Sequence, residues 1–300
     1  MTYFDFRKRQ RYNHPQNRKH IEGMISVTVC TAALCENGKK IICTSDRKVY
    51  NPELGIAYEP PQRKIISITP RIIMMNAGDL EFQTAIQHRF YDSISGRKKR
   101  NLKIRNAANI YIKCLNDESA VMSEQKILAP LNLNFQTFYK EQKKMEPDFV
   151  KKIANDLNIF QSPISETIIT GFDSEGGHIY CIYNSGIVCR DEVGYASIGG
   201  GGKNSDSQLM LSKYTQQADA ISALLQVYWA KKRAEANPSV GEYTDMCIVT
   251  PTEVQFFTES NIQQIDSLFK MAQENEQKQF EIAKEQLGGT IQKRRSEENK

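Results

Sequence analysis

The stretch VTVCTAALCENGKKIICTSD, residues 27–46, decides the fold class of this chain. As far as Cys35 its side chains alternate as in a strand, where successive residues point to opposite faces. The pair Asn37-Gly38 readily adopts the positive φ angles of a tight turn. Residues 40–46 then have the pattern of a returning strand. The stretch therefore predicts an antiparallel hairpin.

Further strands are expected along the chain, where apolar and β-branched residues gather between turn residues such as Pro70 and Pro251. Such runs are typical of strands that bury at least one face. The expected strands are residues 64–68, 72–77, 166–172, 177–183, 186–190, 246–249 and 253–257.

Helical patterns separate these groups of strands. Asp79 is suited to cap a helix that runs to about residue 95. The other expected helices lie within 104–160, over 205–214 and 216–235, and from Ser260 onward. Because strand and helix blocks alternate, the two helix blocks are expected to cover opposite faces of two stacked antiparallel sheets. The pattern alone predicts a layered α+β fold.

The composition is that of an ordinary globular protein, with 40% hydrophobic and 25% charged residues in a chain of 300. No run of about 18 apolar residues is present, so no membrane span is expected. The first 25 residues lack the apolar run of a secretory signal. The seven cysteines have no paired metal-ligand spacing, which favours free thiols in a reducing, cytoplasmic compartment.

The net charge of +5 is concentrated in residues 1–25 and 97–105. Basic clusters can bind nucleic acid, but a solvated surface is favoured here because neither aromatic interleaving nor zinc-finger spacing accompanies them. Residues 1–25 have no periodic pattern and are interpreted as a flexible basic extension or propeptide. The domain is expected over residues 26–258, followed by a C-terminal helix and charged tail over 259–300.

Five segments in this order resemble proteasome β-type subunits and the related bacterial ring protease. They are residues 27–47, 64–79, 170–177, 197–202 and 240–245. Lys64 and Gly78 are 14 positions apart (78 − 64 = 14), as the corresponding residues are in that family. The resemblance spans about residues 26–258. It implies the four-layer αββα sandwich of N-terminal-nucleophile hydrolases, assembled into rings.

In that family a threonine hydroxyl attacks the peptide carbonyl, and the free α-amine of the same threonine takes the proton. The resemblance implies that Thr28 is the nucleophile. It further implies that Lys64 is the cation that lowers the proton affinity of the hydroxyl and the amine, with Asp46 as its orienter. The N–H of Gly78 is the implied oxyanion donor. The structural alternative is a strand threonine beside an Asp46–Lys64 ion pair without a catalytic role.

Residues 26, 28 and 30 share a strand face, so Ser26 and Cys30 are the second and third choices of nucleophile. The residues before Thr28 count against activity, because its nitrogen is an amide until the bond after Val27 is cut. An amide nitrogen cannot act as the base.

Two supporting groups of the family are also altered. Gly200 stands where the family has a serine, and Gly241 where it has an aspartate. Thr244 can replace a second serine. Asp245 and Glu242 are the carboxylates expected nearest to the missing one.

The sequence thus predicts a proteasome-like threonine-type peptidase subunit that hydrolyses polypeptides within a homo-oligomeric ring. An ATP-dependent unfoldase is a partner expected by analogy, and no metal or organic cofactor is implied. Two alternatives stay open. One is a catalytically inactive subunit, favoured by the N-terminal extension and disfavoured by the retained Asp46–Lys64–Gly78 set. The other is an amidohydrolase of the same fold acting on a small amide.

Overall fold

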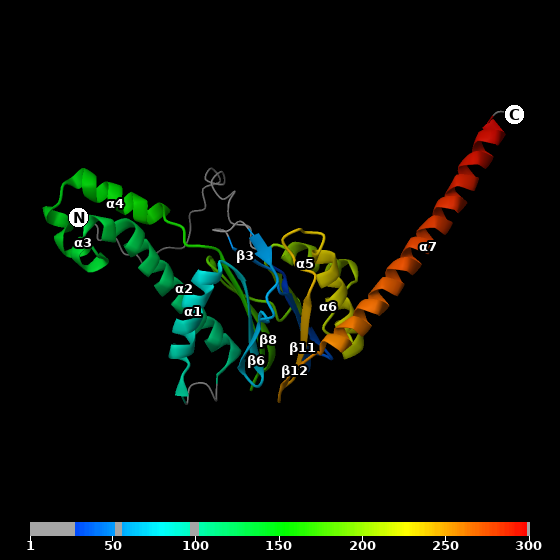
Figure 1. Cartoon of the computed structure of the whole chain (residues 1–300), viewed down its shortest axis with the longest axis horizontal. Coiled ribbons are helices and arrows are strands. Elements are labelled where there is room, and N and C mark those ends of the chain that lie inside the picture. The colour runs from blue at the N-terminus through cyan, green and yellow to red at the C-terminus, as the bar shows by residue number, and fades with distance from the viewer. Residues whose placement is uncertain (1–27, 52–55, 97–101, 299–300) are drawn as a thin grey trace.

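The computed structural model describes residues 28–51, 56–96 and 102–298 of the chain. The predicted basic extension, residues 1–25, lies outside the described residues, as does most of the basic run at 97–105. The protein is a mixed α/β structure built on two five-stranded antiparallel sheets (Figure 1). A separate two-stranded sheet pairs β3 (Val49–Asn51) with β4 (Ile56–Tyr58).

The first sheet has the order β10-β1-β2-β11-β12. At its centre lies the hairpin predicted from residues 27–46, whose turn has positive φ at Glu36, Asn37 and Gly38. In the pairing of β2 with β11, Asp46 is opposite Thr244. The strands are β1 (Cys30–Cys35), β2 (Lys40–Asp46), β10 (Tyr195–Ile198), β11 (Thr244–Val249) and β12 (Val254–Phe256).

The second sheet has the sequential order β5-β6-β7-β8-β9, which is a meander of hairpins. Gly171 in its central strand has φ +150°, and a Cβ there would lie 2.2 Å from the carbonyl oxygen of Arg71. Glycine is therefore needed for β7 to approach the β5–β6 turn. The strands are β5 (Ile65–Thr69), β6 (Ile72–Gly78), β7 (Ser165–Asp173), β8 (Gly176–Tyr183) and β9 (Gly186–Cys189).

A hydrophobic core fills the space between the two sheets, and both contribute to it. Strand β6 illustrates the alternation. Ile73 and Met75 face the first sheet within this core, whereas Ile72 and Met74 face the helices on the other side. Both faces of the second sheet are therefore apolar, which explains the unbroken apolar run in β6.

Two helices cover the outer face of each sheet (Figure 1). Helices α1 (Leu80–Ser93) and α2 (Ile104–Ser123) pack on the second sheet through residues such as Phe90 and Tyr111. Helices α5 (Gly202–Leu211) and α6 (Ala220–Ala234) pack on the first sheet through residues such as Leu209 and Val227. The prediction that two helix blocks cover opposite faces of stacked antiparallel sheets is confirmed.

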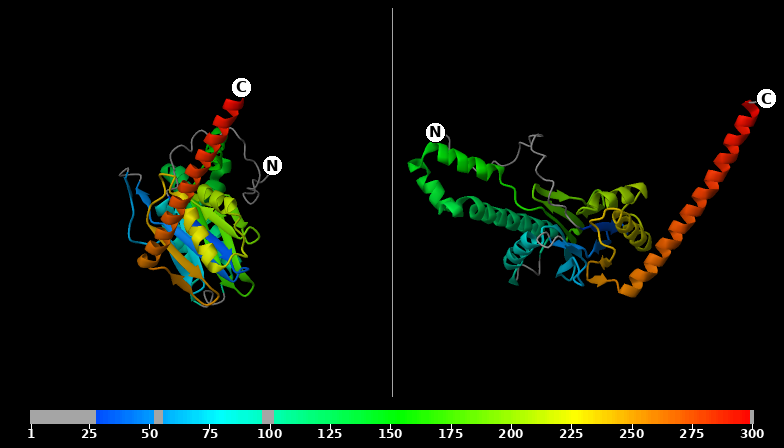
Figure 2. Two further views of the ribbon diagram at one scale, coloured as in Figure 1. Left: turned by 90° about the vertical axis from the view of Figure 1, so that its right-hand side faces the viewer. Right: turned by 45° about the horizontal axis from the view of Figure 1, so that its top comes forward.

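Residues 104–160 contain more than one helix, as predicted. Beyond α2 the chain passes through a π-helical turn (Glu124–Leu128) and a 3-10 turn (Ala129–Leu131). It returns through α3 (Phe135–Glu141), a 3-10 turn (Gln142–Lys144) and α4 (Pro147–Ile159). These segments form a helical arm with its own small core, composed of Leu128, Phe138, Ile153 and Leu157 and their neighbours. The arm projects from the sheets at the end opposite α7 (Figures 1 and 2).

Helix α7 (Glu259–Glu298) begins one residue before the predicted Ser260 and is 40 residues long. Its first turns pack against α6, where the Tyr228 hydroxyl donates to Asp266 Oδ1 at 2.7 Å. The rest projects away from the sheets (Figure 2), with Phe280 and Leu287 62% and 61% exposed. Among the described helices, none combines the length and apolarity needed to cross a membrane.

The helices predicted over 205–214 and 216–235 occupy different bounds. Helix α5 begins at Gly202, within the glycine run. Helix α6 begins at Ala220, because the side chain of Asp219 caps it by accepting from the N–H groups of Ile221 and Ser222 at 3.0 Å each.

The cysteines are free thiols, as predicted, and are spread over the packed layers. Cys43 and Cys247 face each other on neighbouring strands in the core between the sheets. Cys114 lies in the layer of α1 and α2, and Cys35 in the layer of α5 and α6. Cys189 in β9 is the exposed member of the set.

Candidate active site

Thr28 lies two residues before the start of β1 and is only 1% exposed. Its carbonyl oxygen accepts from the N–H of Gly201 at 3.0 Å. Its hydroxyl donates to Oδ1 of Asp46 at 3.0 Å. The backbone and the side chain of Thr28 are thus both held in one orientation.

Asp46 ends β2 and is completely buried. Its Oδ1 accepts from the Thr28 hydroxyl, from the Val29 N–H at 3.1 Å and from Lys64. Its Oδ2 accepts from the N–H groups of Lys48 and Gly241, at 3.2 and 2.8 Å. Hydrogen bonds to the ionised form of a buried carboxylate stabilise its charge, and here five donors do so.

Lys64 precedes β5, so it brings a cation from the second sheet to groups of the first. Its Nζ donates to Oδ1 of Asp46 at 2.8 Å and to the carbonyl oxygen of Lys48 at 2.5 Å. Its third contact is with Oγ1 of Thr28. A neighbouring ammonium favours the deprotonated form of a hydroxyl, so this contact is suited to activate Thr28 as a nucleophile.

Gly78 ends β6 and has φ +122°. A Cβ there would lie 2.2 Å from the carbonyl oxygen of Ile164, and the neighbouring Asp79 donates its N–H to that oxygen at 2.9 Å. Close packing is therefore one reason for a glycine at this position. Among the described residues, no hydrogen bond joins Gly78 to Thr28, Asp46 or Lys64, and its role as oxyanion donor stays a prediction.

Of the two alternative nucleophiles, Ser26 and Cys30, the structure describes only Cys30. Ser26 lies outside the described residues. Cys30 is completely buried, and its Sγ is 3.8 Å from the carbonyl oxygen of Asn76. Burial raises the pKa of the Cys30 thiol well above its usual value, although the Lys64 ammonium partly opposes this effect. A thiol with a raised pKa is a poor nucleophile, so the surroundings of Cys30 favour Thr28.

Backbone contacts dominate at two positions where the sequence departs from the proteasome-like pattern. The carbonyl of Gly200 accepts from the Asn237 side chain at 2.7 Å. Gly241 contributes its N–H to Asp46, as described above. Thr244, the proposed replacement hydroxyl, has a 3.4 Å contact with the carbonyl of Glu242. At positions 200 and 241, where serine and aspartate side chains are absent, the main chain makes the contacts, one of them to Asp46.

Asp245 is committed to other partners. Arg47 donates to it through two nitrogens, at 2.9 and 2.6 Å, and Arg63 lies 3.5 Å from its Oδ1. This ion-paired group joins β2, the segment before β5 and β11. Asp245 is therefore engaged by two arginines instead of standing free to replace the missing carboxylate.

The carboxylate that lies against Gly241 comes from Glu59, a residue that no motif of the sequence indicates. A Cβ on Gly241 would lie 1.6 Å from Oε1 of Glu59. That oxygen is buried without a hydrogen-bond partner among the described residues, while Oε2 accepts from the Tyr243 N–H at 3.3 Å. Glu59 follows β4 in a proline-rich segment, where residue spacing gives no sign of its contact with position 241.

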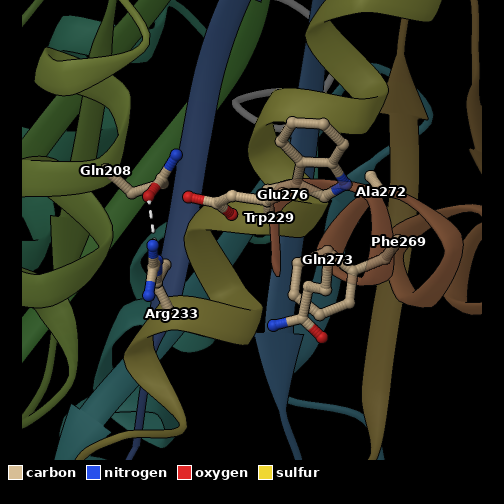
Figure 3. A pocket seen from close by; sticks show the side chains of 7 residues that line it. All are labelled: Gln208, Trp229, Arg233, Phe269, Ala272, Gln273 and Glu276. Atoms are coloured by element: carbon tan, nitrogen blue, oxygen red, sulfur yellow. Dashed lines mark hydrogen bonds between the residues drawn. The ribbon is translucent and has the colours of Figure 1, made fainter. Parts of the chain in front are cut away.

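A cavity and a polar cluster are built from residues other than those around Thr28. A cavity of about 330 Å³ between α5, α6 and α7 is lined by Trp229 and Phe269, with Arg233 donating to Gln208 at 3.3 Å (Figure 3). In the β7–β8 hairpin, Asp173, Glu175 and His178 could together offer three metal-ligand atoms. All three already have partners: Asp173 accepts from the Ile104 N–H at 2.9 Å, His178 contacts Asp191 at 2.7 Å, and Glu175 accepts from Lys103 at 2.5 Å.

Comparison with known proteins does not add to this geometry. No protein-family model and no curated protein matches the chain.

Proposed function

We propose that the chain is a threonine-type peptidase subunit of the N-terminal-nucleophile kind, with a four-layer αββα sandwich. The observation that carries the proposal is the contact of Lys64 with both Asp46 and the Thr28 hydroxyl. Two stacked antiparallel sheets with helices on their outer faces are also what such a sandwich requires.

The proposed reaction begins once the Val27–Thr28 bond has been hydrolysed. Free α-amines in general have pKa values near 8, so the amine of a processed Thr28 can take the hydroxyl proton directly or through water. Oγ1 attacks the substrate carbonyl carbon, and the tetrahedral intermediate expels the leaving amine, which takes up the proton. Water then hydrolyses the ester and releases the second product. Lys64 stabilises the developing alkoxide, and the Gly78 N–H donates to the oxyanion.

The proposed substrate is unfolded polypeptide, and the proposed assembly is a homo-oligomeric ring, with an ATP-dependent unfoldase as a partner. These three points rest on the resemblance of the sequence to proteasome β-type subunits. The projecting helix α7 is compatible with self-assembly, because Phe280 and Leu287 are exposed on it.

The second candidate is a non-catalytic subunit of the same fold. The glycines at 200 and 241 favour it, because neither position offers a side-chain hydroxyl or carboxylate to a free Thr28 amine. The buried Asp46 and its contact with Lys64 favour the catalytic candidate, since a charged pair in this position is costly to bury without a use.

The test is intact mass and N-terminal sequencing of the protein and of Thr28→Ala, followed by assay on an unfolded polypeptide. The proposal expects a wild-type chain that begins at Thr28 and cleaves the substrate, and an unprocessed, inactive Thr28→Ala. A wild-type chain that keeps residues 1–27 and cleaves nothing favours the non-catalytic subunit. Processing that also occurs in Thr28→Ala would show that another protease cuts the bond.

A further inference from the structure

Lys231 is a completely buried lysine in the last turn of α6, behind the candidate site. Its Nζ donates to Oε1 of Glu235 at 2.5 Å and to the carbonyl oxygens of Gly241 and Glu242 at 3.0 and 2.8 Å. An ammonium has three protons, so each has one acceptor. Two of the three acceptors are main-chain atoms of the loop between α6 and β11.

The same loop contacts Asp46 from its other side. The N–H of Gly241 donates to Oδ2 of Asp46 at 2.8 Å, while the carbonyl of Gly241 accepts from Lys231. Glu59 and Lys48 close around the Cα of Gly241, since a Cβ there would meet their atoms at 1.6 and 2.8 Å. Gly241 is therefore fixed between Lys231 on one side and Asp46 on the other.

Negative and positive side chains form a series of ion pairs that leads from α6 to the candidate nucleophile. Glu235 is paired with Lys231, the Gly241 loop follows, and Asp46 is paired with Lys64 beside the Thr28 hydroxyl. Burial lowers the pKa of Lys231, and the nearby carboxylates of Glu235 and Asp46 oppose this effect. A buried ammonium is unfavourable unless its contacts compensate, and an apolar side chain would fill the same space at lower cost.

We propose that Lys231 is a positioning residue for Asp46. By holding the Gly241 loop, Lys231 keeps the Gly241 N–H on Oδ2. Oδ1 is then the oxygen directed at Lys64 and Thr28. This inference rests on the proposed function for its catalytic consequence, whereas the contact between the loop and Asp46 can be tested without activity.

The test compares Lys231→Met with Lys232→Met in the full chain. Lys232 is the matched control because it is the next residue of the same helix and pairs with the other oxygen of Glu235, at 2.7 Å. Amide hydrogen exchange at Gly241 is measured by NMR. Loss of the loop contacts in Lys231→Met is expected to speed this exchange about tenfold. In Lys232→Met the exchange should stay within about twofold of wild type.

The Asp46 amide, which donates to the carbonyl of Val29 at 3.1 Å, reports on the strands themselves and should exchange at the wild-type rate in both variants. Unchanged exchange at Gly241 in Lys231→Met overturns the proposal. An equal increase in exchange at the Gly241 and Asp46 amides also overturns it, because it would indicate general loosening of the structure. If Lys231→Met does not fold, Lys231→Gln is measured instead, because its amide keeps N–H donors for the loop without the charge, and a smaller increase in Gly241 exchange is expected.

The catalytic consequence is read in the processed enzyme. In Lys231→Met, kcat is expected to fall about tenfold with KM within about threefold of wild type, because the Asp46 carboxylate is held less firmly while its backbone and the substrate contacts are kept. A loosened Gly241 with unchanged kcat would overturn the positioning role. Absence of turnover in wild-type enzyme with a free Thr28 would refute the proposed function alone.

Discussion

The Nζ of Lys64 lies 2.8 Å from Oδ1 of Asp46, although the two residues adjoin or end strands of different sheets. Asp46 ends β2 of the first sheet, and Lys64 precedes β5 of the second. The contact is therefore formed only when both sheets have stacked. The same nitrogen contacts the hydroxyl of Thr28, so assembly of the candidate site and closure of the core are one event.

Replacing the proposed nucleophile gives the first prediction. Thr28→Ala is expected to reduce peptidase turnover about 1,000-fold or more, because no hydroxyl remains to attack the carbonyl. Thr28→Ser keeps the hydroxyl and should retain measurable turnover. Lys64→Ala should also remove turnover while the fold is kept, as judged by circular dichroism.

Thr31→Ser, three residues further along in β1, is the matched control, because the Thr31 hydroxyl contacts Ser197 and Ser205 at 2.9 and 2.7 Å and has no contact with Lys64 among the described hydrogen bonds. It should keep wild-type turnover. Full activity in purified Thr28→Ala or Lys64→Ala would remove that residue from the mechanism.

The space beside Gly241 gives the second prediction. In Gly241→Ala the new methyl group would overlap Glu59, so the free energy of unfolding should fall by about 2 kcal/mol. Glu59→Ala in the same chain should restore part of that loss, which a double-mutant cycle by urea denaturation would measure. Strictly additive effects would show that Glu59 is not the obstacle.

Gly288→Ala is the control for glycine replacement. It lies in α7 with nothing within 4 Å of the added Cβ. Alanine has the higher helix propensity, so helix content should be unchanged or higher, with a local gain of about 0.5–1 kcal/mol. A loss of stability in this control would mean that helix propensity alone does not determine the effect of a replacement in α7.

The attachment of α7 gives a prediction on pH. Burial alone would raise the pKa of Asp266, but hydrogen bonds from Lys270 and Tyr228 lower it below the usual 3.8. A group whose pKa is lower in the folded state contributes stability above its unfolded pKa. That contribution should be lost as the pH falls below about 3.8 towards the lowered value.

Hydrogen exchange of the first turns of α7, measured across this pH range, checks the expectation. Exchange relative to the intrinsic rate should increase at low pH in wild type and be insensitive to pH in Asp266→Asn. The same pH response in both proteins would assign the effect to another group.

Self-association gives the fourth prediction. Phe280 and Leu287 lie seven residues apart (287 − 280 = 7), which places them on one face of α7. Replacing both with Glu is expected to lower the mass of the assembly in sedimentation velocity, because two exposed apolar contacts are lost. Gln279→Glu, an exposed neighbour, is the control for added charge. An unchanged assembly in the double variant would place the subunit contacts elsewhere.

The sequence was sufficient to predict much of the fold because the predicted strands alternate or are uniformly apolar, and several of them end next to a turn that contains Gly or Pro. Residues 166–172 and 177–183, for example, were predicted within one residue of the ends of β7 and β8. The proximity of Thr28, Asp46 and Lys64 followed from the resemblance to proteasome β-type subunits. Periodicity cannot show which oxygen of a carboxylate receives which donor, and such contacts came only from the structure.

Lys231 and Glu59 were missed for different reasons. Lys231 is followed by Lys232 and Arg233, and a basic run at the end of a helix usually interacts with the helix dipole and solvent. Its complete burial depends on the α6–β11 loop folding over it. Glu59 lies 182 positions from Gly241 (241 − 59 = 182), so no local pattern connects them. Long-range contacts of this kind depend on how the sheets and loops pack together.

Because the cysteines lie in different layers, their reactivity can report the order in which those layers open during unfolding. Cys189 should react with a thiol reagent at once, since it is exposed. Cys43 and Cys247 can react only when the sheets part, Cys114 when α1 and α2 lift away, and Cys35 when α5 and α6 do. Thiol labelling followed over time in mild denaturant would therefore measure when each layer opens. The native cysteines serve as the probes, so no residue has to be replaced.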